Sequence, residues 1–216
     1  MEAGRQLGAK LQSYANRQDV VVMAIPRGGV PIGFQVAAAL GARLDVFILR
    51  KLGVPWQEEL AFGAIASGHV RVLNTEVVEA TGLSELDIER VTAVEKRELD
   101  RRERLYRGDR PPVDVKGMSV ILVDDGIATG SSMKAAIAAL RQMNPARLVV
   151  AVPVAPLLTC QRLRHEVDEF LCLRQPEDFY AVGQFYDDFT PVSDEEVIEL
   201  LGRSAALALH KAPQNT

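Results

Sequence analysis

Two adjacent aspartates, Asp124 and Asp125, follow an apolar run in the stretch VILVDDGIATGSS, residues 120–132. A glycine and a Thr-Gly-Ser-Ser turn come next, at the start of a helical pattern. A turn that leads directly into a helix gathers unpaired backbone N–H groups at the positive end of the helix dipole, and this arrangement favours a phosphate. Gly130 lets the backbone approach an anion closely, and nearby hydroxyls add donors.

The two carboxylates need a different partner, because like charges repel. Carboxylates accept hydrogen bonds, and a ribose offers paired hydroxyl donors next to its 5-phosphate. The joined pattern therefore predicts a ribose 5-phosphate site. Taken separately, Asp-Asp-Gly is common as a turn after a strand, and Thr-Gly-Ser-Ser is common as a helix cap. The sequence contains no GxxxxGK[ST] motif, and no GxGxxG follows its first predicted strand.

Apolar runs alternate with helical patterns along most of the chain, which indicates parallel βαβ units. Strands are expected at 20–25, 44–49, 119–125, 146–154 and 167–173, and helices at 30–41, 131–143 and 156–165. Ligands of such sheets bind beyond the carboxyl ends of the strands, so functional residues should follow strands directly.

Two stretches interrupt this alternation. Residues 53–116 contain short strand-like pieces and a charged helix from about Ser84 to Tyr106, and the tail after Leu173 ends in a helix opened by Ser193. We expect one domain over 1–216, with a core at about 20–175, the insertion at 53–116, and a hood with a C-terminal helix at about 176–210.

The composition narrows the class of protein. The chain has 216 residues, 48% of them hydrophobic, a formal charge of -4 and a pI near 5.5, which disfavours broad binding to nucleic acid. Its two cysteines, Cys160 and Cys172, lack metal-ligand spacing and are expected in the core. No signal-type run or membrane-length apolar window is present, so we expect a cytoplasmic protein without membrane contact.

The stretch VILVDDGIATGSS resembles the phosphoribosyl diphosphate (PRPP) signature of the type I phosphoribosyltransferases, and is closest to a branch whose acceptor is not assigned. The resemblance implies a three-layer α/β/α fold. Its doubly wound, mainly parallel sheet has strand order 2-1-3-4-5, with an inserted flexible loop and helix and a small C-terminal hood. It implies that Asp124 and Asp125 hold the ribose hydroxyls and that the next loop wraps the 5-phosphate, through Gly126, Ile127, Ala128, Thr129, Gly130 and Ser131.

A basic loop follows the first predicted strand, in the stretch AIPRGG. Arg27 offers a fork of donors, and Gly28 and Gly29 free the backbone beside it, so the loop suits a diphosphate, although a tight turn with an exposed arginine has the same pattern. The resemblance implies a pyrophosphate-binding loop here, in which family members often hold a cis peptide. Arg50 and Lys51, expected at the end of the second strand, are further candidates for the pyrophosphate, or ordinary solvated residues.

The resemblance implies a Mg²⁺-dependent reaction in which a nitrogenous base or amine displaces pyrophosphate from PRPP. Asp124, Asp125 and Arg27 would be the catalytic residues, and the two aspartates would bind Mg²⁺ directly or through water. Members that salvage 6-oxopurines carry an acidic residue where this chain has Ala128, which weakens that acceptor class. Glu58 and Glu59 are alternative proton acceptors, or ordinary exposed carboxylates.

Aromatic residues are dense after the last predicted strand, and they suggest a platform for a planar acceptor: Phe179, Tyr180, Phe185 and Tyr186. A small apolar subdomain that holds the tail on the sheet would have the same composition. Arg97, Arg101 and Arg104 form a basic stripe on the inserted helix, which is either a solvated face or part of a closing loop.

Two other functions are compatible with these residues. One is a non-catalytic regulator that keeps the PRPP pocket and binds nucleic acid or a protein partner. The other is a phosphosugar-processing α/β protein with different chemistry. The aromatic tail is also compatible with a homodimer.

Overall fold

The computed structural model describes residues 2–211, and side chains as far as residue 207. Its central sheet has five parallel strands in the order β2-β1-β6-β7-β8. Their bounds are Arg43–Val46 for β2, Val20–Ala24 for β1, Ser119–Val123 for β6, Arg147–Val154 for β7 and Glu169–Arg174 for β8. Counted along the core alone, this is the predicted order 2-1-3-4-5.

Helices cover both faces of this sheet, which gives the three predicted layers. Helices α1 (Glu2–Lys10) and α2 (Gly29–Leu40) pack on one face, and α5 (Ser131–Gln142) and α6 (Leu157–Arg164) on the other. Every residue of β1 and β6 is buried, because both strands lie inside the sheet and are covered on both faces. The centre of the core therefore lies directly beneath the two loops with candidate site residues.

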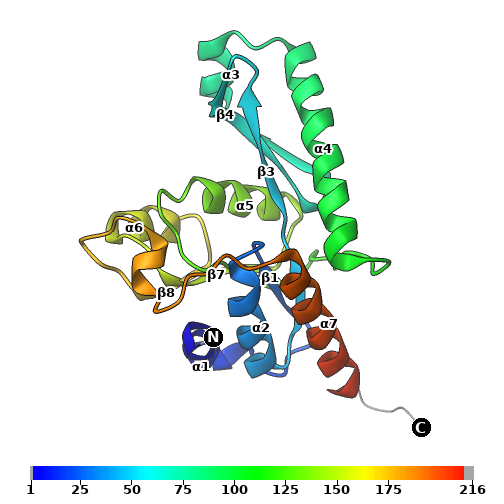
Figure 1. Cartoon of the computed structure of the whole chain (residues 1–216), viewed down its shortest axis with the longest axis vertical. Coiled ribbons are helices and arrows are strands. Elements are labelled where there is room, and N and C mark those ends of the chain that lie inside the picture. The colour runs from blue at the N-terminus through cyan, green and yellow to red at the C-terminus, as the bar shows by residue number, and fades with distance from the viewer. Residues whose placement is uncertain (1, 212–216) are drawn as a thin grey trace.

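The insertion forms a second, antiparallel sheet that projects from the core (Figure 1). It contains β3 (Leu49–Val54), β4 (Gln57–Ala66) and β5 (Val70–Leu73), followed by α3 (Thr75–Thr81) and α4 (Glu85–Arg107). The predicted charged helix is confirmed, and Ser84 caps it through the amide of Asp87.

The second strand is predicted at residues 44–49, and the predicted end of this strand is wrong. Strand β2 stops at Val46, and Leu49 already begins β3 of the other sheet. Phe47 and Ile48, which connect the two strands, are fully buried, so the apolar run continues through the change of sheet. No glycine or proline marks the boundary, and the insertion therefore begins earlier than residue 53.

The base of the insertion is tied to the core by a buried ion pair. Arg107, at the end of α4, places its Nε 2.8 Å from the Oδ1 of Asp45 on β2, and its Nη2 donates to the carbonyl of Val46. Along α4, Glu98 pairs with Arg102 and Glu103 pairs with Arg107. The helix is thus held along its own surface and anchored at its end.

The tail returns over the carboxyl edge of the central sheet. A 3₁₀ turn, η3 (Val182–Phe185), precedes α7 (Asp194–Lys211), which packs against α2 and α4. Ser193 caps α7 as predicted, because its hydroxyl accepts from the amide of Glu196. Two further 3₁₀ turns, η1 (Gln12–Tyr14) and η2 (Ser67–His69), join other elements. Within the described residues, no helix has the length and apolar character needed to cross a membrane.

Candidate active site

The loops after β1 and β6 meet because their strands are neighbours in register, with Ala24 opposite Val123. The peptide bond between Pro26 and Arg27 is cis, as the resemblance predicts. A Cβ atom on Gly28 would lie 1.8 Å from the Oδ2 of Asp125, which is closer than any side chain permits. The glycine is therefore required by the close approach of this loop to the carboxylates.

The two carboxylates are crowded and carry uncompensated charge. The amide of Asp125 donates to the Oδ1 of Asp124 at 2.9 Å. Burial, and next the charge of Asp125, raise the pKa of the Asp124 carboxyl well above its usual range, and burial raises the pKa of Asp125. No lysine or arginine among the described side chains offsets either charge. This pair is suited to a cation or to hydroxyl donors from a ligand.

The predicted phosphate loop, residues 126–130 after β6, ends at Gly130, which adopts φ +85° at the start of α5 and has no side chain to cap the helix. The amide of Ser131 donates to the Oγ1 of Thr129 at a long distance of 3.4 Å, and the amides of Ser132 and Met133 remain open to an anion. Thr129, Ser131 and Ser132 are exposed beside them. Thr159 of α6 holds the loop in place, because its hydroxyl donates to the carbonyl of Ala128 at 3.1 Å.

The amide of Ile127, one of the predicted phosphate ligands, already has a backbone partner. It donates to the carbonyl of Val154 at 2.9 Å, and the side chain of Ile127 is buried in the core. The backbone donor that the prediction assigned to a phosphate is thus already used by the neighbouring strand. The amide of Gly29 is engaged in the same way, with the carbonyl of Ile25.

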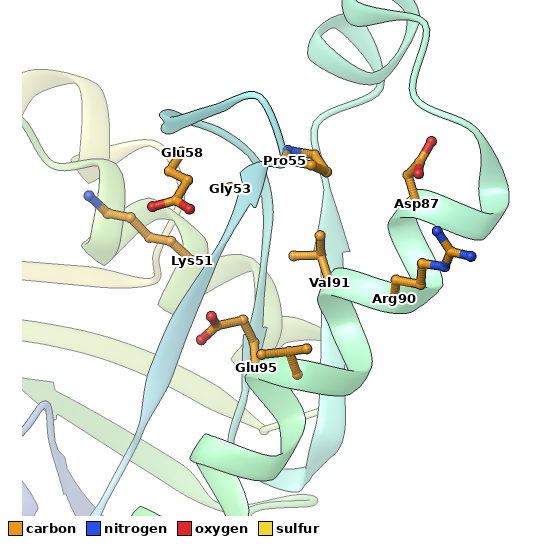
Figure 2. Close-up of a pocket in the computed structure, with 9 residues that line it drawn as sticks. Lys51, Gly53, Pro55, Glu58, Asp87, Arg90, Val91 and Glu95 are labelled. Atoms are coloured by element: carbon orange, nitrogen blue, oxygen red, sulfur yellow. The ribbon is translucent and has the colours of Figure 1, made fainter.

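Arg50 and Lys51 do not end a strand of the central sheet but lie within β3 of the inserted sheet. Arg50 is paired with Glu95 of α4, at 2.7 Å. Lys51 is exposed, and Figure 2 shows it extending away from α4, on the same side of the hairpin as Glu58. Lys51 lines a cleft of about 640 Å³ together with Ser131, and no residue of the Arg27 loop lines that cleft.

The hood aromatics separate into different roles. Phe179 and Phe185 stack on one another with centroids 5.5 Å apart, while Tyr180 is 89% exposed. Tyr186 reaches the site: its hydroxyl donates to the backbone carbonyl of Asp125 at 2.5 Å, and its ring lies beside Phe189. The hood therefore reaches the carboxylate end of β6 through Tyr186.

Sequence reasoning missed three contacts that shape the site. They are the hydrogen bond of Thr159 to the phosphate loop, the anchoring of Tyr186 on Asp125, and a 3.7 Å ion pair between Arg27 and Asp194 of α7. Each joins segments far apart in the chain, and no local pattern signals such a pairing. Of these partners, the sequence predicts only the helix that Ser193 opens, on which Asp194 lies.

A second group of potential metal ligands lies at His69, Asp100 and Glu103, away from the carboxylate pair along the chain. Its members already have partners, since Asp100 pairs with His69 at 2.7 Å and Glu103 with Arg107 at 2.8 Å. This group is a poorer cation site than Asp124 and Asp125, whose charges are not offset.

Comparison with known proteins agrees with this geometry. Residues 1–190 match the family model of the phosphoribosyl transferase domain. Two strains of Mycobacterium tuberculosis, CDC 1551 and H37Rv, have proteins named for phosphoribosyl transfer that are 45% identical to this chain over 203 residues. The match covers 94% of this chain but 46% of each relative, so the chain spans about half their length.

A solved structure also resembles the chain closely. The crystal structure of the protein TT1426 from Thermus thermophilus shares 41% identity, with a TM-score of 0.81. The likeness covers 92% of this chain and 94% of that one, and thus includes the inserted sheet as well as the core. The chain belongs to the phosphoribosyl transferase domain family.

Proposed function

We propose that the chain transfers the ribose 5-phosphate group from PRPP to a nitrogenous base or amine and releases pyrophosphate. One observation carries this proposal: the Arg27-Gly28-Gly29 loop lies directly on an uncompensated carboxylate pair, next to an uncapped helix start. A 5-phosphate, ribose hydroxyls and a diphosphate would each find matching groups there, in the order in which PRPP carries them.

In this proposal the residues divide the donor substrate among them. Asp124 and Asp125 accept from the ribose hydroxyls, the first turn of α5 binds the 5-phosphate, and Arg27 faces the diphosphate. The acceptor nitrogen forms a bond to C1 of the ribose as the bond from C1 to the diphosphate oxygen breaks. The acceptor's proton leaves to solvent or to a base, and the positive charge of Arg27 stabilises the departing pyrophosphate.

A magnesium ion fits the same site. Its preferred ligands are carboxylate and phosphate oxygens, and the two aspartates hold negative charge that no described side chain offsets. When bound there, the ion would neutralise negative charge on the diphosphate and on the carboxylates beside the ribose. Asp124 and Asp125 are the residues proposed to hold it, directly or through water.

The acceptor would approach from the side of the hood. Tyr186 lies against Asp125 there, and Val182 fills the space above Gly126, where a Cβ would meet it at 2.6 Å. Ala128 offers no carboxylate to the acceptor. The acceptor's proton must therefore leave to solvent or to another base. This environment supports an acceptor that does not depend on an acidic residue in the loop.

The test is pyrophosphate release from PRPP with Mg²⁺, in the presence of separate pools of purines, pyrimidines, pyridines and simple amines. We expect release with one pool, and loss of at least about a thousandfold in the Asp124→Asn/Asp125→Asn double variant. The control is Asp109→Asn/Asp114→Asn, which removes two exposed aspartates from the loop after α4. Wild-type turnover by the first double variant would refute the site assignment.

A second candidate is a regulator that senses PRPP without catalysis and binds nucleic acid or a protein. The absence of a carboxylate at Ala128 favours it, and the net charge of -4 opposes direct binding to nucleic acid. If PRPP binds but no pool supports release, binding of a macromolecule that changes with PRPP concentration would establish the regulator instead.

A further inference from the structure

Arg27, the basic residue of the diphosphate loop, is held by a carboxylate from the far end of the chain. Its Nη1 lies 3.7 Å from the Oδ1 of Asp194, the first residue of α7. Both side chains are partly exposed, at 48% and 39%. This ion pair involves Nη1, and a guanidinium has five N–H donors, so other donors of Arg27 can bind an incoming anion while Asp194 stays in place.

Asp194 is itself fixed by a buried partner. The hydroxyl of Tyr106, near the end of α4, donates to the same Oδ1 of Asp194 at 2.6 Å. Tyr106 is 2% exposed, and burial together with this hydrogen bond raises its pKa to about 12. The hydroxyl therefore stays protonated and keeps donating at any physiological pH.

Two arginines of α4 differ from Arg27 because they form ion pairs within their own helix. Arg101 and Arg102 both pair with Glu98 of their own helix, at 2.7 and 2.9 Å. Arg27 has no such local carboxylate, and its ion pair in the described part of the chain is the one with Asp194. The orientation of Arg27 thus depends on a residue that lies outside its own loop and helix.

We propose that Asp194 is a positioning residue, which holds the Arg27 guanidinium ready for the diphosphate, and that Tyr106 links this function to the insertion. An unrestrained arginine must give up several side-chain rotations when it binds an anion, and a held one has fewer left to lose. The proposal rests on the function proposed above, and it adds two residues that do not touch the substrate.

The test measures equilibrium binding of three probes by calorimetry with Mg²⁺: PRPP, inorganic pyrophosphate and ribose 5-phosphate. We expect Asp194→Asn to weaken PRPP and pyrophosphate binding about fivefold, and to leave ribose 5-phosphate binding unchanged. Tyr106→Phe should weaken the same two probes about twofold, since it only loosens the carboxylate. The control Glu195→Gln removes an exposed first-turn charge from α7 and should leave all three unchanged.

A double-mutant cycle separates positioning from a general effect on the fold. In an Arg27→Gln background, Asp194→Asn should cause no further loss of pyrophosphate binding, because the residue it positions is gone. Losses that multiply, or an equal loss for ribose 5-phosphate, would overturn the inference. Asp194→Glu, which keeps the charge, should recover most of the affinity; no recovery in a variant with wild-type thermal stability would also overturn it.

An error in the proposed function itself would give a different binding result. If Arg27→Gln leaves PRPP and pyrophosphate binding unchanged, the diphosphate site itself is misassigned. If Arg27→Gln weakens them and Asp194→Asn does not, the function stands and only the positioning role is refuted.

Discussion

Among the described residues, the buried carboxylate of Asp45 and the half-buried pair of Asp124 and Asp125 differ in whether a positive charge lies beside them. At the base of the insertion, Asp45 is 5% exposed and is matched by Arg107, with backbone amides of Val46 and Val113 donating to it as well. At the carboxyl edge of β6, Asp124 and Asp125 lie side by side without any described cation. At Asp45 the chain itself supplies the positive charge that balances the carboxylate. At Asp124 and Asp125 a ligand must supply it.

The largest expected effect is at the compensated site. Arg107→Met should lower the free energy of unfolding by about 3–5 kcal/mol, because it leaves Asp45 buried without its partner. Urea unfolding measures this loss. The matched control is Arg102→Met, whose ion pair lies on the surface of α4 and should contribute less than about 1 kcal/mol. Equal losses in the two variants would remove the distinction between a buried anchor and a surface pair.

The next effect concerns the contact between the glycine loop and the carboxylates. Gly28→Ala should lower the rate of pyrophosphate release from PRPP about a hundredfold, since its Cβ would displace the Asp125 carboxylate and a shift of about 1 Å suffices for a loss of rate of that size. Gly202→Ala on α7, where a Cβ would meet open space, is the control and should react at the wild-type rate. A wild-type rate in the first variant would mean that the loop is not placed over the carboxylates.

A smaller effect, of opposite sign, is expected for stability at the uncompensated site. Because the pKa of Asp124 is raised in the folded protein, its ionisation destabilises the fold as pH rises from the ordinary value of about 3.9 through the raised one. Without PRPP or metal, Asp124→Asn should be more stable than the wild type at pH 7, on the order of 1 kcal/mol. The difference should vanish towards about pH 4, as measured by urea unfolding in a chelator; a less stable variant at pH 7 would contradict the account.

The smallest effect is at the hood. Tyr186→Phe removes one hydrogen bond to the Asp125 carbonyl and should lower stability by about 1 kcal/mol, or about 2–4 °C in the midpoint of thermal unfolding. Tyr180→Phe changes an 89% exposed side chain and should leave the midpoint unchanged. An unchanged midpoint in Tyr186→Phe would show that the hood is not held through this contact.

The sequence predicts the carboxylate edge better than the insertion, for a physical reason. At β6 the strand, the aspartates and the phosphate turn are consecutive, so local chemistry identifies the site. In the insertion, the apolar run through Phe47 and Ile48 crosses from one sheet to another without a turn signal. Arg50 and Lys51 were consequently assigned to the wrong strand. Pairings such as Arg27 with Asp194 depend on the tertiary fold, and no spacing predicts them.

The most direct test of the central claim is the thermal unfolding midpoint of the wild type and of Asp124→Asn/Asp125→Asn, each with and without PRPP and Mg²⁺. Without ligand, the variant should unfold at the same or a higher temperature. At ligand concentrations about a hundredfold above the dissociation constant, the free energy of unfolding of the wild type should rise by about 2.7 kcal/mol, and its midpoint should rise accordingly. Neither the free energy of unfolding nor the midpoint of the variant should change. An equal gain in both proteins would show that the ligand does not supply the charge missing at these carboxylates.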